Sequence, residues 1–141
     1  MTDYLKVLVI NIFIRGVKTM AEFKEVSNSQ TLNEILDESI QRKVFIFKHS
    51  TTCPISARAW QEVQNFINQS SSEILVTMIK VIESRPISNQ VAEDLGVKHQ
   101  SPQVLLLSDR QVIWTTSHQS VTQANLIKAL AGEIQPFNLN L

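Results

Sequence analysis

The sequence predicts one α/β domain in which helices flank a central mixed β-sheet. Three observations support this prediction. Short runs of β-branched and aromatic residues alternate with segments whose apolar residues recur every three or four positions. The last two strand-like runs are separated by only two polar residues, as in a hairpin, and a helical segment follows them. The resulting order, β-α-β-α-β-α-β-β-α, favours a mixed sheet over a doubly wound parallel sheet.

The first part of the domain is expected to form a strand, a helix and a second strand. A short strand over residues 23–27 precedes a helical pattern over residues 29–43, which Ser29 or Thr31 is expected to cap. The run "VFIFKHS", residues 44–50, is apolar without alternation up to its polar end. This pattern predicts a strand that is buried on both faces of the sheet.

The middle of the chain is expected to form a long helix, a strand and a short helix. Apolar residues recur at helical spacing over residues 57–67, after the lone Cys53. Strand character returns in residues 71–83. A short helix around residues 88–95 is expected to stop at Gly96, because glycine is favoured just past a helix end.

The last part of the domain is expected to form a hairpin and a helix. Two apolar strands, residues 103–108 and 111–117, are joined by a tight polar break at residues 109–110. Ser120 or Thr122 is expected to cap the final amphipathic helix. This hairpin before a terminal helix favours a mixed sheet of the thioredoxin type.

Length, charge and cysteine content limit the possible functions. The chain has 141 residues, which is enough for one domain with a substantial core. It has no net charge, with 13 basic and 13 acidic side chains. We therefore expect neither a nucleic acid nor a membrane as a partner. A single cysteine excludes an intramolecular disulfide and a cysteine-based zinc site, and it fits a reducing, cytoplasmic location.

Residues 1–19 are interpreted as an N-terminal extension of uncertain structure, ahead of a domain over residues 20–141. Residues 5–14 are mostly apolar, but they are far short of the roughly 20 apolar residues that a membrane helix needs. Asp3 precedes them and no small-x-small cleavage site follows, unlike in a signal peptide. Met20 then begins a stretch typical of the start of a small cytosolic domain. The alternative is an extra strand or helix packed on the domain.

The chemistry of the chain is expected at Cys53. A turn through Thr52 precedes it and Pro54 follows at once. Proline is tolerated at the first helical position because its missing N–H would have no partner there, so Cys53 is expected at or near the helix N-cap. Free backbone N–H groups and the positive end of the helix dipole favour a thiolate there, which is the attacking form of sulfur. The alternative is a small buried hydrophobic side chain.

Ser56 stands three residues after Cys53, on the same face of the first helical turn. A cysteine there would resolve a mixed disulfide within the molecule, whereas serine cannot. A mixed disulfide on Cys53 must therefore wait for an outside thiol. We expect the Ser56 hydroxyl to donate a hydrogen bond to the sulfur and to stabilise the thiolate. The alternative is an ordinary polar residue in a first helical turn.

Ser101-Pro102 stands immediately before the strand over residues 103–108. In a sheet of the thioredoxin type, a proline at this position is cis and faces the active-site cysteine. The backbone of Ser101 is then expected to bind an extended thiol substrate by strand addition. Proline is also tolerated at a strand start for backbone reasons alone. His99, close before this pair, is a candidate for lining the thiol pocket.

A few other polar residues complete the candidates. Lys48 and His49 are expected to add positive potential near the sulfur, although strand alternation points them in opposite directions. Arg58 and Arg85 are candidates for holding a carboxylate of a small thiol, although solvated arginines are commoner. The three histidines show no metal-ligand spacing, so no metal site is expected.

Thr52-Cys53-Pro54-Ile55-Ser56, after the "FIFKHS" strand, resembles the TCPIS motif of the monothiol bacilliredoxins (YtxJ-like proteins). These are small thioredoxin-fold proteins of low-GC Gram-positive bacteria that use bacillithiol in place of glutathione. The resemblance covers Met20 to about Gly132. It implies removal of bacillithiol from S-bacillithiolated proteins, with bacillithiol as the co-substrate and no bound cofactor. Cys53 would take the bacillithiol onto its sulfur, and a second thiol, either bacillithiol or another redoxin, would then free it.

Two other functions stay open at this point. One is a redox-sensing or binding module of the thioredoxin-like type whose cysteine is modified under oxidative stress without turnover. The other is a thioredoxin-like structural domain with an inert cysteine. A thiol–disulfide oxidoreductase differs from both in needing an accessible thiolate and repeated exchange.

Overall fold

The computed structural model describes residues 20–132 of the chain. The predicted extension over residues 1–19 lies outside this range, and so do residues 133–141 at the other end. The expected division of the chain at residue 20 therefore stays a prediction. Within the described part, no helix is long and apolar enough to cross a membrane.

The order of the elements confirms the predicted order of strands and helices. The strands are β1 (Glu22–Glu25), β2 (Val44–His49), β3 (Leu75–Lys80), β4 (Gln103–Ser108) and β5 (Gln111–Ser117). The helices are α2 (Ser29–Glu38), α3 (Pro54–Asn68), α4 (Arg85–Leu95) and α5 (Gln123–Leu130), with a short 3-10 turn, η1 (His118–Ser120), before α5.

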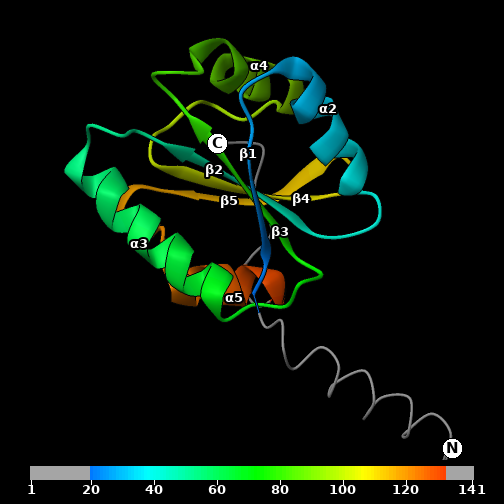
Figure 1. The fold of residues 1–141 in the computed structure, drawn as a ribbon, viewed down its shortest axis with the longest axis vertical. Coiled ribbons are helices and arrows are strands. Elements are labelled where there is room, and N and C mark those ends of the chain that lie inside the picture. The colour runs from blue at the N-terminus through cyan, green and yellow to red at the C-terminus, as the bar shows by residue number, and fades with distance from the viewer. Residues whose placement is uncertain (1–19, 133–141) are drawn as a thin grey trace, which may run out of the picture.

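The strands form one mixed sheet in the order β1-β3-β2-β4-β5. β1 and β2 pair with β3 in parallel, whereas β4 is antiparallel to β2 and β5 is antiparallel to β4. Helices α3 and α5 cover one face of the sheet and α2 and α4 cover the other (Figure 1). The predicted α/β fold with a central mixed sheet is therefore confirmed.

Strand β2 is buried along its whole length, as its unbroken apolar run predicts. Phe45 and Phe47 point into the core shared with α3 and α5. Val44 and Ile46 point into the second core, shared with α2 and α4. The same alternation continues to the polar end of the strand and sends its last two side chains to opposite faces of the sheet.

The structure corrects the start and the end of the first helix. Its cap is Asn28, whose side-chain oxygen accepts the Thr31 N–H at 2.8 Å, in place of Ser29 or Thr31. Asparagine, serine and threonine are all good caps, so the sequence pattern alone left several neighbouring candidates. The helix also ends at Glu38 rather than at residue 43, because the Ser39 hydroxyl donates to the Leu36 carbonyl at the helix end.

The later helices differ less from the prediction. Helix α4 starts at Arg85, three residues before the predicted start, with Pro86 in the first turn, where its missing N–H costs nothing. It stops at Gly96, whose φ of +67° suits glycine, as predicted. Thr122 is the cap of α5 and accepts the Asn125 N–H at 3.1 Å, which confirms one of the two predicted caps.

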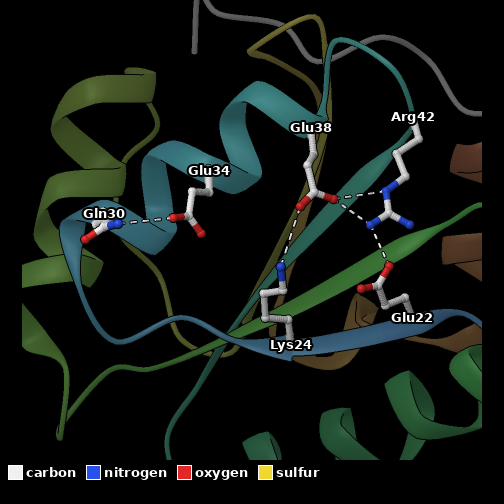
Figure 2. A network of polar contacts seen from close by, with 6 residues as sticks. All are labelled: Glu22, Lys24, Gln30, Glu34, Glu38 and Arg42. Atoms are coloured by element: carbon white, nitrogen blue, oxygen red, sulfur yellow. Dashed lines mark hydrogen bonds and ion pairs between the residues drawn. The ribbon is translucent and has the colours of Figure 1, made fainter.

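Surface ion pairs join β1 to α2 at the end of the sheet where β1 and β2 begin (Figure 2). Arg42 donates to Glu38 at 2.5 Å and to Glu22 at 2.6 Å. Lys24 pairs with Glu38 from the other side at 3.5 Å. The hydrogen bond from Arg42 to Glu38 holds the pKa of Glu38 below its usual value. Because all four side chains are partly exposed, the network is a solvated one.

Candidate functional site

Cys53 is the N-cap of α3, as the Cys-Pro pair predicts. Its backbone is extended, with φ −103° and ψ 124°, and its carbonyl accepts the first helical hydrogen bond, from Ala57 N–H at 2.9 Å. Pro54 occupies the first helical position. A turn closed by the Cys53 N–H and the Ser50 carbonyl at 3.3 Å leads from β2 into this cap. The sulfur therefore stands at a helix start, next to the positive end of the helix dipole.

The thiol of Cys53 is free and only half-buried. Its neighbours in the chain, Thr52 and Pro54, are exposed. The position differs from that of a cysteine used to fill a core, since the side chains of the α3 core come from later turns of the helix. A reagent in solution can approach the sulfur from the side of the exposed turn.

Ser56 lies in the first turn of α3, three residues after Cys53, and is fully buried, with an exposed fraction of 0%. Its hydroxyl accepts the Ser50 N–H at 2.9 Å and lies 2.7 Å from His49 Nδ1. Burial lowers the pKa of His49, so the ring is neutral at pH 7 and its Nδ1 can accept the hydroxyl proton. The predicted hydrogen bond from Ser56 to the sulfur of Cys53 is not among the contacts of residues 20–132, where the Ser56 hydroxyl pairs with the Ser50 N–H and with His49 Nδ1.

The pairing gives Ser56 a different structural task. Through Ser50 and His49 it ties the first turn of α3 to the end of β2 and to the turn that precedes Cys53. His49 is a site residue whose role the sequence pattern did not reveal. The expectation that it adds positive charge is also wrong at neutral pH, because its buried ring is neutral. The only signal was its place at the polar end of an otherwise apolar strand.

An aromatic stack holds the His49 ring in place. The ring lies 5.3 Å from Phe47 and 6.1 Å from Trp60, measured between centroids, and Trp60 is 6.0 Å from Phe47 in a stacked arrangement. Such contacts restrict the ring to one orientation. The His49 ring is therefore held in position for its hydrogen bond with Ser56.

The Ser101-Pro102 peptide bond is cis, in agreement with the sequence-based prediction. It lies directly before β4, which pairs with β2, the strand that leads to Cys53. The Pro102 carbonyl accepts the His118 N–H at 2.9 Å, which ties η1 to the proline. The Ser101 hydroxyl is buried without a hydrogen-bond partner within residues 20–132.

A cavity of about 220 Å³ lies beside the cysteine, between the first turns of α3 and η1. It is lined by Pro54, Ile55, Arg58, Ala59, His118, Gln119 and Val121. Arg58 is exposed and has no ion pair among residues 20–132. Arg85 starts α4, on the other face of the sheet. Of the two predicted arginines, only Arg58 therefore lines the cavity.

Lys48 and His99 are brought together, but away from this cavity. Lys48 is fully buried, and its amine lies 3.2 Å from His99 Nδ1 on the α4 side of the sheet. His99 does not line the cavity beside Cys53, because it follows α4 and faces that amine. Within the described range, no group of three or more potential ligand side chains could hold a metal ion.

Comparison with solved structures shows the same fold. A structure described as having a thioredoxin fold is 27% identical, with a TM-score of 0.69, and the match covers 77% of this chain and 93% of that one. Thioredoxin of Fasciola hepatica is 12% identical, with a TM-score of 0.62 and coverage of 79% and 99%. Mitochondrial thioredoxin 3 of Saccharomyces cerevisiae is 19% identical, with a TM-score of 0.58 and coverage of 78% and 94%.

Comparison with protein-family models gives a more specific match. The model described as "Monothiol bacilliredoxin BrxC" matches residues 24–126, more than half of the 141-residue chain. This range includes both the cysteine turn and the cis-proline. The match and the thioredoxin fold together support a thiol redox role, in agreement with the resemblance found in the motif.

Proposed function

Because the chain belongs to the monothiol bacilliredoxin family, we propose that it removes bacillithiol from S-bacillithiolated proteins in the cytoplasm. The observation that supports this most directly is the geometry of its only cysteine. Cys53 is the N-cap residue of α3 and a free, half-buried thiol, and the position of a resolving cysteine is taken by the buried Ser56. Such a site exchanges disulfides through one sulfur at a time.

The reaction follows from the chemistry of one thiolate. The Cys53 thiolate attacks the bacillithiol sulfur of the protein–bacillithiol disulfide, so a Cys53–bacillithiol disulfide forms and the substrate protein leaves as a thiolate, which takes up a proton. A second thiolate then attacks the bacillithiol sulfur on Cys53. That step forms a new disulfide and returns the Cys53 thiolate. Bacillithiol or another redoxin supplies the second thiol, and no bound cofactor takes part.

Two features beside the sulfur support binding of such a substrate. The Ser101 N–H and carbonyl make none of the backbone hydrogen bonds found in the turns and loops of residues 20–132, so they can pair with an extended segment of the substrate protein. The cavity between α3 and η1 carries the exposed Arg58, which has no ion pair within residues 20–132 and can bind a carboxylate of the small thiol.

The proposal is tested with a purified S-bacillithiolated protein. Intact mass spectrometry is expected to show transfer of one bacillithiol to the wild-type chain, and excess bacillithiol is expected to give multiple turnovers. The Cys53→Ser variant is expected to show neither the adduct nor turnover. A wild-type chain that acquires no adduct on Cys53 would refute the mechanism. An adduct that forms once and is never released would favour the sensor function instead.

Arg58 offers a sharper test of the substrate. We expect Arg58→Gln to raise KM for a bacillithiolated peptide by about threefold to tenfold and to change kcat less, because one exposed charge-assisted hydrogen bond is lost. Arg85→Gln, on the opposite face of the sheet, is the matched control and should leave KM unchanged. Equal effects of the two substitutions would remove Arg58 from the binding site.

A further inference from the structure

Two buried polar side chains face each other across β2 and β4, below the loop that leads to the cis-proline. Lys48 and Gln103 are partners in the antiparallel register of these strands. Their exposed fractions are 0% and 3%. Burial of an amine and an amide in a sheet of Val, Ile and Leu is costly unless their hydrogen bonds are satisfied. Their partners therefore indicate what the two side chains are used for.

Both polar atoms of the Gln103 side-chain amide form hydrogen bonds with the loop over residues 98–101. Its nitrogen donates to the Lys98 carbonyl at 3.1 Å, and its oxygen accepts the Gln100 N–H at 3.2 Å. The chain between these two bonds carries His99, and the residue after them is Ser101 of the cis peptide. The amide therefore closes the loop directly before the proposed substrate-binding backbone.

Lys48 holds the same loop from the neighbouring strand. Its amine donates to the Ser88 carbonyl in α4 at 2.9 Å and to His99 Nδ1 at 3.2 Å. His99 can accept because its pKa is lowered, first by partial burial and then by the charge of Lys48, so its ring is neutral at pH 7. Neither partner of the amine is a carboxylate, so the lysine is not half of a buried ion pair.

We propose that Lys48 and Gln103 are positioning residues, which hold residues 98–101 so that the Ser101 backbone meets the substrate segment beside Cys53. This inference rests on the proposed function. It adds to the proposed site two residues whose side chains lie on the α4 side of the sheet, opposite α3. A methionine in place of the lysine would pack in the apolar core without the cost of burying an amine. The amine contributes a link between α4, the loop and the sheet that no apolar side chain supplies.

The experiment compares Lys48→Met and Gln103→Met with Lys43→Met. Lys43 stands directly before β2, at the end far from Cys53, and its amine donates to the Ser108 hydroxyl at 2.9 Å. For thiol–disulfide exchange with a bacillithiolated peptide, we expect Lys48→Met and Gln103→Met each to raise KM about tenfold, since a small displacement of a binding group is sufficient for such a loss. Alkylation of Cys53 by iodoacetamide should stay within about twofold of the wild-type rate, because its helix cap is untouched.

Hydrogen exchange gives a readout that needs no substrate. In Lys48→Met and Gln103→Met, the amides of residues 98–101 should exchange about tenfold faster than in the wild type and in Lys43→Met. Should Lys48→Met fail to fold, His99→Ala removes one of the two contacts of the amine from an exposed residue and is expected to show the same two effects in weaker form.

The outcomes separate the two proposals. If Lys48→Met and Gln103→Met both keep the wild-type KM and the wild-type rates of hydrogen exchange at residues 98–101, the positioning role is overturned and the proposed function still stands. A wild-type chain that shows no thiol–disulfide exchange with the bacillithiolated peptide would overturn the proposed function. In that case hydrogen exchange alone tests whether Lys48 and Gln103 position residues 98–101. Wild-type rates of amide exchange at these residues in both Lys48→Met and Gln103→Met would overturn the positioning role.

Discussion

Strand β2 has polar contacts at both of its ends, and the two sets differ in kind. Before its start, Arg42 pairs with Glu22 and Glu38 in a network of partly exposed, full charges (Figure 2). At its end, Lys48 and His49 are buried, and each binds partners without charge. The first set lies at the end of β2 far from Cys53, whereas the second lies directly before the turn that carries Cys53.

The two sets of contacts at the ends of β2 differ in what can replace a partner that a substitution removes. At the exposed end, water can solvate both partners, so the loss is small and depends on salt. At the buried end, removal of one partner leaves the other desolvated and unpaired, which costs more than the hydrogen bond contributed. The buried end should therefore respond to substitution more strongly than the charged end, even though it contains fewer charges.

The largest expected effect is that of Ser56→Ala. The substitution leaves both the Ser50 N–H and His49 Nδ1 without their buried partner. We expect the free energy of unfolding to fall by about 2–3 kcal/mol, measured by urea denaturation. Thr51→Ala in the adjoining exposed turn is the control and should cost less than about 0.5 kcal/mol. Equal losses in the two variants would contradict the buried pairing.

A second effect should appear as a dependence of stability on pH. Burial lowers the pKa of Lys48 to about 8, from its ordinary value of 10.5. Between these values the unfolded chain binds a proton that the folded chain lacks, so stability rises with pH in this window. Relative to Lys48→Met, wild type should gain up to about 1.4 kcal/mol per pH unit between pH 8 and about 10.

Urea denaturation at several pH values from 7 to 10 measures this difference. The comparison with Lys48→Met removes the contributions of all other groups that titrate in the same range. Lys43→Met, which keeps the buried amine of Lys48, is the control for replacing a lysine next to β2. Parallel profiles of wild type and Lys48→Met would show that the amine of Lys48 is hydrated in the folded protein.

The smallest expected effect belongs to the charged end. Arg42→Ala should lower the free energy of unfolding by less than about 1 kcal/mol, and the loss should shrink in 1 M NaCl. Arg58→Ala, at an arginine without an ion pair in the described residues, is the control and should cost less still. A loss for Arg42→Ala as large as that for Ser56→Ala would overturn the contrast between the two ends.

Local patterns in the sequence predicted the fold and the place of the sulfur. Apolar periodicity identified every strand and helix in order, and the Cys53-Pro54 pair identified the start of α3, because proline is restricted by its own backbone. The cis Ser101-Pro102 bond followed from the predicted sheet type. These features depend on neighbours in the chain.

Contacts between distant residues were beyond such patterns. The cap of α2 was misplaced because several adjacent side chains have similar capping strength. The pairing of Ser56 with His49 depends on how α3 crosses the end of β2, and the pairing of Lys48 with His99 depends on how α4 packs on the sheet. No spacing in the sequence specifies either crossing, so the partners of the buried polar groups could not be predicted.

The buried hydroxyl of Ser56 also has a consequence for how this site can change in evolution. A thiol is a weak donor and a weak acceptor, so a cysteine at position 56 would serve Ser50 and His49 poorly. A gain of a second redox-active sulfur would therefore bring a loss in stability, unless the histidine changed as well. Conversion of the one-thiol site to a two-thiol site by Ser56→Cys alone is therefore expected to lower the free energy of unfolding, which selects against that single substitution.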